Sequence, residues 1–209
     1  MTVRMGPLIV DAVDPPAVEA FWAAAIGPDA QRRYLRFRPE REPKTVKNRV
    51  HLDLAVDEWS GVTRLVALGA QVLADHLPGW VTMADVEGNE FCAFPTAGTG
   101  APARLFAVCT DSDRPEALAE WWSRRVGARV GPGPDQTPRW LRDSSGWEEL
   151  IWKFVRVADP RTCANRWRWS VTGSADELIA AGAVALDDGE LADPAGNDFS
   201  AAGPTRSAG

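Results

Sequence analysis

The chain of 209 residues carries an internal repeat, and this repeat limits the folds open to it more than any other feature. The phrase ADVEGNEFCAF at 84–94 returns as ADPAGNDFSAA at 192–202. Three further blocks recur in the same order, pairing 11–27 with 111–127, 34–54 with 151–171, and 65–73 with 178–186. Ordered matches at four places predict two homologous domains, 1–98 and 103–204, joined by the linker PTAGTGAPA.

A shorter periodicity lies inside each domain, where an apolar strand is followed by an amphipathic helix that ends at a glycine. In the first helix, Val18, Phe21 and Ile26 share one face, and Asp14 is suited to cap the N-terminus. Short strands follow the glycine, so the unit is strand–helix–three strands, incomplete in the first module of each domain. This plan predicts an α+β fold with helices on one face of a mostly antiparallel sheet. The glycines that close the four predicted helices are Gly27, Gly69, Gly127 and Gly182.

Charge, hydropathy and cysteine content limit the classes of molecule that the chain is expected to bind. The net charge is −6 and no segment is strongly basic, so we expect no nucleic-acid partner. Apolar runs fall short of the roughly 18–20 residues that span a bilayer, so we expect no membrane partner and a cytoplasmic location. The three cysteines are odd in number and widely spaced, which argues against a disulfide framework or a zinc knuckle. A small molecule is the partner that remains, with self-association left open.

Several motifs together resemble one known superfamily. The strand NRVHLDLAVD, the LGA and WVTMAD segments after it, and the closing D-x-x-G-N-x-F strand look like those of the vicinal oxygen chelate (VOC) superfamily. That superfamily includes glyoxalase I, bleomycin-resistance proteins and extradiol dioxygenases. The likeness is nearest to its short glyoxalase-like domains, two in tandem. It implies the glyoxalase/bleomycin resistance/dioxygenase fold, in which paired βαβββ-type modules curl into half-barrels around a small-molecule site, often with a divalent metal.

The resemblance also marks the positions at which the superfamily holds its metal. His51 stands at the ligand position of a first strand and Cys92 at the carboxylate position of a last strand, whereas the second domain has Arg168 and Ser200 there. The other module of the first domain would contribute from Pro7–Leu8, which has no ligand side chain, and from the strand YLRFRPE, which offers arginines. Such metals need about three imidazole, carboxylate or thiolate ligands. We therefore expect no cofactor; the alternative is a divalent metal in the first domain.

Side chains alternate along a strand, so Val50 and Leu52 should pack on the helices while His51 and Asp53 face the concavity. A polar inward face suits a small anionic or keto-acid ligand, with Arg36 as a bidentate clamp and His51 with Glu90 as candidate catalytic residues. The alternative is that Arg36–Glu90 and Arg168–Asp198 are buried ion pairs that bind nothing. The residues predicted to share the inward faces and bind a ligand are Tyr34, Arg36, Arg38, His51, Asp53, Glu90 and Cys92 in the first domain and Lys153, Arg168, Asp198 and Ser200 in the second.

Tryptophan is concentrated in the second domain, where by the repeat most tryptophans replace apolar residues of the helix-facing side. We therefore expect most of them in the core. Trp140 and Trp147 differ, because they lie in the insertion GPGPDQTPRWLRDSSGWEEL, which the first domain lacks. A loop of this kind can cover the concavity as an adaptable lid, so these two are the tryptophans expected to contact a ligand.

Three function classes follow from the sequence. The favoured one is a glyoxalase-like protein that binds a small molecule on the concave face, with catalysis unproven and a degenerate metal site. The second is an active glyoxalase- or lyase-type enzyme that uses His51 with a carboxylate or a metal. The third is a non-catalytic structural or drug-sequestering module, for example one whose cavity is filled by its own side chains.

Overall fold

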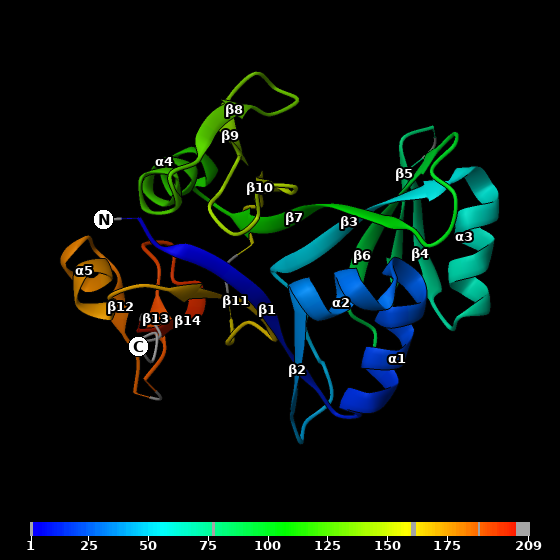
Figure 1. The fold of residues 1–209 in the computed structure, drawn as a ribbon, viewed down its shortest axis with the longest axis horizontal. Coiled ribbons are helices and arrows are strands. Elements are labelled where there is room, and N and C mark those ends of the chain that lie inside the picture. The colour runs from blue at the N-terminus through cyan, green and yellow to red at the C-terminus, as the bar shows by residue number, and fades with distance from the viewer. Residues whose placement is uncertain (1, 77, 160–161, 188, 204–209) are drawn as a thin grey trace, which may run out of the picture.

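The computed structural model describes residues 2–76, 78–159, 162–187 and 189–203, which form two curved mixed sheets and a few helices (Figure 1). This confirms the predicted α+β class. The larger sheet has eight strands in the spatial order β4 (Gln71–His76), β5 (Trp80–Ala84), β6 (Glu90–Thr96), β3 (Val50–Asp57), β7 (Arg104–Ser112), β10 (Ile151–Arg156), β9 (Pro138–Arg142) and β8 (Arg129–Pro132). The smaller has six, in the order β12 (Val184–Ala185), β13 (Leu191–Ala192), β14 (Asp198–Ala202), β11 (Trp167–Thr172), β1 (Arg4–Ala12) and β2 (Leu35–Pro39).

Helices pack against both sheets. Two of them lie against β1 and β2, a third packs on β3 and β6, and a fourth packs on β9 and β10. None of the helices formed by the described residues is long and apolar enough to cross a membrane. In chain order the helices are α1 (Pro15–Ile26), α2 (Pro28–Tyr34), α3 (Glu58–Ala67), α4 (Pro115–Val126) and α5 (Ala175–Ala180).

Each sheet combines strands from both sequence repeats. In the eight-stranded sheet β3 of the first repeat pairs antiparallel with β7 of the second, and in the six-stranded sheet β1 pairs with β11 in the same way. The sequence led us to expect one concavity within each repeat, and the pairing corrects this expectation. The physical reason is that the first strand of every module has an open edge, and joining two such edges supplies their backbone hydrogen bonds.

The modules differ in completeness. The first is β1–α1–α2–β2, in which a second helix stands where two strands were expected, so it is incomplete as predicted. The third module was also predicted to be incomplete, and this is wrong. It is complete, because the insertion after Gly127 forms the hairpin β8–β9 and extends the sheet beside β10. The expectation that this insertion is a lid is therefore wrong. Leu141 on β9 is fully buried, so burial of the hairpin's apolar side explains why it joins the sheet.

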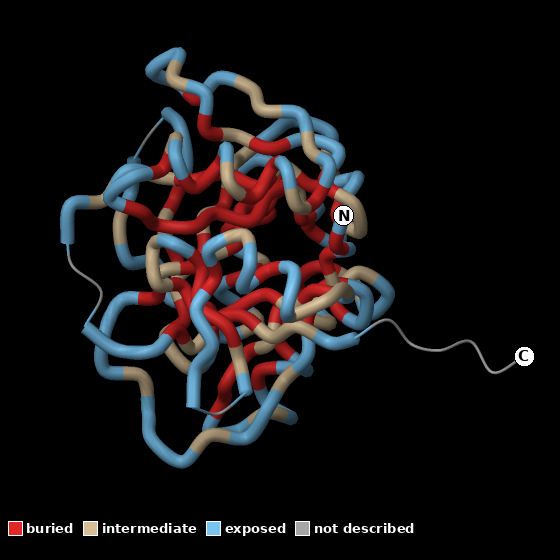
Figure 2. The backbone as a smooth tube through the Cα atoms, turned by 90° about the vertical axis from the view of Figure 1, so that its left-hand side faces the viewer, coloured by how far each residue is buried: buried red, intermediate tan, exposed pale blue. Residues whose placement is uncertain are grey.

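The core lies between the sheets and the helices (Figure 2). Val50, Leu52 and Leu54 are fully buried, as their alternation predicted. The ring of Trp122 on α4 lies 5.0 Å from Trp152 and 5.5 Å from Trp169, so one helix side chain connects strands of both sheets. The prediction that most tryptophans are core residues is confirmed. Those almost fully buried are Trp22, Trp122, Trp147, Trp152, Trp167 and Trp169.

The repeated phrase is a structural turn. Asp85 accepts hydrogen bonds from the backbone and side-chain amides of Asn89 and, at 3.0 Å, from the indole nitrogen of Trp22 on α1. Asp193 repeats this arrangement with Asn197 and, at 3.1 Å, with the indole nitrogen of Trp122 on α4. Each turn therefore ties the closing strand of one sheet to a helix of the other module in its repeat. This need explains why the chain contains the phrase twice.

Candidate functional site

The eight-stranded sheet has one face turned away from α3 and α4, which we call the open face. At its centre Lys153 Nζ lies 2.8 Å from Asp53 Oδ2, and the Cys109 thiol donates to the same oxygen at 3.2 Å. His51 Nε2 lies 3.6 Å from the other carboxylate oxygen. Strand register explains the grouping, because Cys109 is opposite His51 on one side and opposite Lys153 on the other, while Asp53 is opposite Cys92. We call these five residues the Lys153 cluster.

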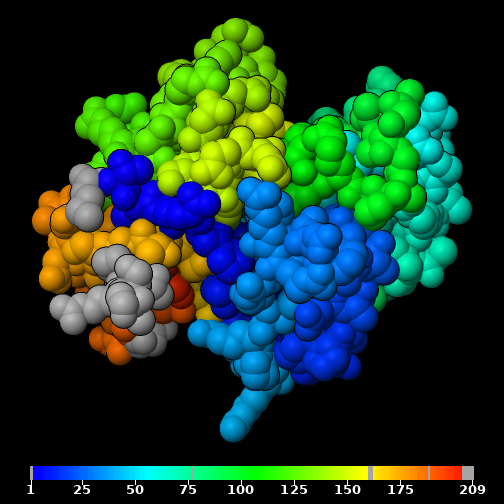
Figure 3. Space-filling view, viewed as in Figure 1, coloured from blue at the N-terminus to red at the C-terminus, as the bar shows by residue number. Residues whose placement is uncertain are grey.

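Aromatic rings surround the ammonium group of Lys153. Its Nζ lies 4.6 Å from the ring centre of Phe106, 5.0 Å from Trp140 and 5.4 Å from Phe94, within the range of cation–π attraction. Trp80 stacks on Phe94 with 5.9 Å between ring centres, and it is 37% exposed. The surface is hollowed between the β8–β9 hairpin and the β4–β5 edge (Figure 3). We call the four residues Phe94, Phe106, Trp140 and Trp80 the aromatic rim.

Burial sets the protonation of the cluster. Desolvation lowers the pKa of His51 below its usual value, against the opposing charges of Asp53 and Asp111, so the imidazole is neutral at pH 7. Desolvation, with the charge of Asp53, raises the pKa of the Cys92 thiol to about 12. The same two causes raise the pKa of Cys109 well above its usual value. The open face therefore presents an ammonium group, a neutral imidazole and two thiols that keep their protons.

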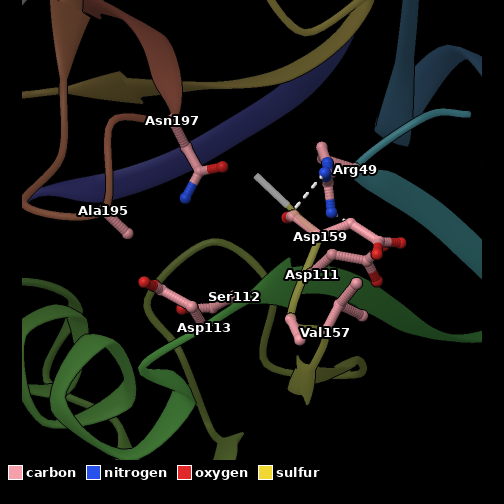
Figure 4. A pocket seen from close by; sticks show the side chains of 9 residues that line it. Arg49, Asp111, Ser112, Asp113, Val157, Asp159, Ala195 and Asn197 are labelled. Carbon is pink, nitrogen blue, oxygen red and sulfur yellow. Dashed lines mark hydrogen bonds and ion pairs between the residues drawn. The ribbon is translucent and has the colours of Figure 1, made fainter. Parts of the chain in front are cut away.

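A cavity of about 390 Å³ adjoins this face (Figure 4). Asp111 follows Cys109 by two residues on β7, so both side chains lie on the same side of the sheet. Arg49 stands opposite Asp111 and donates to the backbone carbonyl of Asp159 at 2.8 Å. Asn197, from the second closing turn, lines the far wall. The open face thus continues into a polar cavity between the two sheets.

The corresponding face of the six-stranded sheet is occupied by its own ion pairs. Arg168 Nη1 lies 2.7 Å from Asp11 Oδ2, and its Nε lies 2.8 Å from Glu190 Oε2. Arg38 contacts the same two carboxylates, at 2.9 Å from Asp11 and 3.6 Å from Glu190. The hydroxyl of Ser200 donates to Glu190 at 3.1 Å. Two guanidinium groups and two carboxylates therefore balance one another, and we call Arg38, Arg168, Asp11 and Glu190 the arginine cluster.

The predicted inward row of the first domain is thus divided between the sheets. His51, Asp53 and Cys92 come together, but Arg38 joins the arginine cluster, and Arg36 donates to the backbone carbonyls of its own segment. The reason is the pairing of modules across the repeats, which brings Lys153 on β10, rather than the strand of Arg36, to the face of His51.

Tyr34 lies apart from both clusters. Its hydroxyl donates to Glu149 Oε2 at 3.2 Å, and burial, the largest cause, raises its pKa to about 12. Trp147 is also outside the open face: it is 2% exposed, and its indole nitrogen donates to the carbonyl of Gly6 at 2.8 Å. The expectation that Trp147 contacts a ligand is corrected by this burial. Trp140, in contrast, lies on the open face.

The two ion pairs considered from the sequence are replaced by other contacts. Glu90 accepts from Lys44 Nζ at 2.6 Å and from the backbone amide of Asn48 at 3.1 Å, rather than pairing with Arg36. Asp198 accepts from the backbone amide of Asn165 at 3.1 Å, while Arg168 pairs elsewhere. Each carboxylate therefore holds the segment that leads into the first strand of its own module, β3 for Glu90 and β11 for Asp198, which is a structural role. Glu90 lies outside the group of donors that contains His51.

Sequence reasoning missed Cys109, Phe94 and Phe106. Nothing in the sequence around Cys109 marks it as a site residue, and only its position opposite His51 shows its part in the cluster. Phe94 could have been assigned to the site from the sequence, since it follows Cys92 by two residues and so lies on the same face of the strand. Phe106 lies next to a register shift between β3 and β7, which strict alternation does not predict.

The Lys153 cluster can be tested against the metal that the superfamily often binds. Donor atoms of His51, Asp53 and Cys92 lie within 4.8 Å of one another. The sequence had indicated only His51 and Cys92 as candidate metal ligands, so Asp53 is an additional one. The residues present nevertheless do not fit a metal. The ammonium of Lys153 bonds to Asp53 at 2.8 Å, so a positive charge already occupies the carboxylate that a metal would need. We therefore assign no metal-dependent step to this face.

Comparisons with known proteins agree with the fold. The chain matches a family described as a glyoxalase-like domain over residues 7–94 and again over 107–202. No curated protein matches it. Among solved structures, glyoxalase I from Zea mays is similar with a TM-score of 0.66 at 11% identity, covering 95% of this chain and 91% of that one. A putative dioxygenase from Bacillus subtilis has a TM-score of 0.62 at 13% identity, covering 97% and 85%.

These identities show a likeness of fold alone. The family match is stronger evidence, since its two regions include most of the chain and follow the internal repeat. The chain therefore belongs to the glyoxalase-like domain family of the vicinal oxygen chelate superfamily, with its modules in tandem.

Proposed function

We propose that the protein binds a small oxygenated molecule with a planar apolar part on the open face of the eight-stranded sheet. One observation carries this proposal. A nearly buried ammonium group, that of Lys153, lies on an uncovered face inside a rim of half-buried aromatic rings. Ligand sites commonly combine a few convergent polar groups with apolar walls.

The chemistry of the cluster indicates which ligand atoms it would hold. An ammonium group has three donors, and the hydrogen bond that Lys153 makes to Asp53 uses one of them. A carbonyl, carboxylate or hydroxyl oxygen can accept from another. The unprotonated ring nitrogen of the neutral His51 imidazole can accept a hydrogen bond from a ligand hydroxyl beside it. The rings of Phe94 and Trp140 supply flat apolar surface for the rest of the molecule.

Tryptophan fluorescence tests this proposal. Phenylpyruvate, which has both a ring and a keto acid, should quench the emission, and pyruvate and benzyl alcohol, which each lack one part, should bind more weakly. Trp140→Phe should remove most of the quenching because Trp140 faces the ligand. Trp59→Phe is the matched control, since Trp59 is 47% exposed but lies on α3, behind the sheet.

Two results would contradict the proposal. One is quenching that survives in Trp140→Phe and disappears in Trp59→Phe. The other is the lack of any quenching or thermal shift across phenylpyruvate, pyruvate, benzyl alcohol and a panel of aromatic drugs. That second result would favour a structural module.

A second candidate function is base catalysis at the same face. His51 is neutral, it lies 3.6 Å from Asp53, and a cation lies on the far side of that carboxylate. Such an imidazole can remove a proton from carbon next to a carbonyl group, while the Lys153 ammonium stabilises the enolate oxygen that forms.

Exchange of the C3 protons of phenylpyruvate in deuterated water, followed by NMR, tests this second function. The rate should exceed the buffer rate and return to it in His51→Gln; a rate equal to buffer with the intact protein would refute it.

A further inference from the structure

The Lys153 cluster contains three side chains that could ligate a metal ion, together with a cationic side chain that would repel one. An imidazole, a carboxylate and a sulfur, from His51, Asp53 and Cys92, have donor atoms within 4.8 Å of one another. Metal–ligand bonds of about 2.0–2.3 Å reach donors at most roughly 4.6 Å apart, so small side-chain rotations would bring the three donors around one ion. The three residues come from two neighbouring strands, β3 and β6, whose hydrogen-bonded register holds them in place.

The opposing group is Lys153. Its ammonium nitrogen lies 2.8 Å from Asp53 Oδ2, so it uses the carboxylate that a metal would need. Its side chain is only 11% exposed, and three aromatic rings hold the ammonium from the other sides. The position of the ammonium is therefore fixed by packing as well as by charge.

We propose that the ammonium group of Lys153 is a built-in substitute for a divalent cation, and that it keeps the site of His51, Asp53 and Cys92 free of metal. Removing this ammonium should turn the three residues into a metal site. The inference does not depend on the proposed ligand, because it concerns only the residues of the chain and the metal ion.

Electrostatic repulsion supports this assignment. Like charges a few Å apart at a partly buried site repel strongly, so a divalent ion cannot share Asp53 with the ammonium at low cost. Lys153 now balances the negative charge of Asp53. If the ammonium were removed, this buried charge would be unpaired, and binding of another cation at Asp53 would be favoured. A metal bound at that position would also take the proton from the Cys92 thiol, since thiolates are the form that ligates metal.

Cobalt(II) titration of the purified chain tests the proposal, because cobalt–thiolate bonds give a charge-transfer absorption that reports ligation by cysteine. The wild-type protein should show no such band. Lys153→Met should bind cobalt at one equivalent, at least about 100-fold more tightly than wild type, given the size of the repulsion removed. Lys153→Gln provides a second variant if the methionine variant does not fold, as judged by circular dichroism.

Matched variants locate the metal. Lys44→Met removes another nearly buried ammonium, paired with Glu90 at 2.6 Å, and should bind no more cobalt than wild type. Adding Cys92→Ser to Lys153→Met should abolish the charge-transfer band, and adding His51→Ala should weaken binding. The proposal is overturned if wild-type protein already gives a stoichiometric cobalt–thiolate band. It is equally overturned if Lys153→Met and Lys153→Gln both fold and neither binds cobalt.

Discussion

The two sheets of this protein share a plan but differ in what fills the face away from the helices. On the six-stranded sheet, two arginines and two carboxylates neutralise one another, and Arg168 is only 3% exposed. On the eight-stranded sheet a single ammonium pairs with Asp53, and the space around it is lined by rings that remain half exposed. The first face is satisfied by its own charges, whereas the second keeps donors and apolar surface for another molecule.

The difference shows which parts of the repeat serve the fold and which serve a site. The closing turns built on Asp85 and Asp193 make the same set of hydrogen bonds in both repeats. The faces beside them have diverged: Cys92 and His51 stand in one sheet where Ser200 and Arg168 stand in the other. Similar turns with different faces indicate one scaffold that carries two environments.

The largest expected effect comes from breaking the arginine cluster. Arg168→Met leaves Asp11 and Glu190 without their closest cation, and loss of one partner from a buried ion pair costs about 3–5 kcal/mol of unfolding free energy. Urea denaturation measures this. Arg36→Met is the control and should change stability by less than about 0.5 kcal/mol, because Arg36 is exposed and donates only to backbone carbonyls. Similar losses for the two variants would show that the arginine cluster is not a special feature of that face.

The next largest effect tests the shared scaffold. Asp85→Ala and Asp193→Ala should each cost about 2–3 kcal/mol, because each leaves an indole nitrogen and an asparagine amide without their acceptor. The two losses, measured by urea denaturation, should agree closely, since the turns are alike. A large loss in one repeat with almost none in the other would contradict the view that both turns have one role.

The smallest expected effect is the contribution of His51, on the open face, to the pH dependence of stability. Burial holds the pKa of His51 in the folded chain below the 6.5 of the unfolded chain. The unfolded state therefore binds more protons below pH 6.5, so stability should fall as the pH is lowered through that value. His51→Gln lacks this group and should show a shallower fall in melting temperature between pH 7 and pH 5. A steeper fall in the variant would mean that the imidazole is stabilised by protonation.

Much of this fold is predictable because it depends on local pattern. The alternation of Val50, His51 and Leu52 identifies the buried side of β3, and the glycines that end the helices, such as Gly127 with a positive φ of 67°, follow from the sequence. The resemblance of the closing strands identifies the superfamily. The pairing between repeats is not local, so the sequence could not show that Lys153 meets Asp53, which is 100 residues away.

The candidate site was therefore only partly predictable. His51, Asp53 and Cys92 lie on two strands of one module, and their alternation and motif placed them together correctly. Trp147 was misplaced because an insertion without a counterpart was interpreted as a loop, although its apolar residues extend the sheet and the core. The balance of Arg168 by Asp11 rather than Asp198 likewise depends on which strands are neighbours, and that is a property of the whole fold.

The most direct test of the contrast between the faces is calorimetric titration of phenylpyruvate into wild type, Lys153→Met and Arg38→Met. Both variants remove a cation that contacts a carboxylate on an uncovered face, at Asp53 in one sheet and Asp11 in the other. We predict that Lys153→Met binds at least about 10-fold more weakly, as expected for a lost charge-assisted hydrogen bond, and that Arg38→Met binds like wild type. Weaker binding in Arg38→Met with unchanged binding in Lys153→Met would contradict the assignment of the site to the eight-stranded sheet.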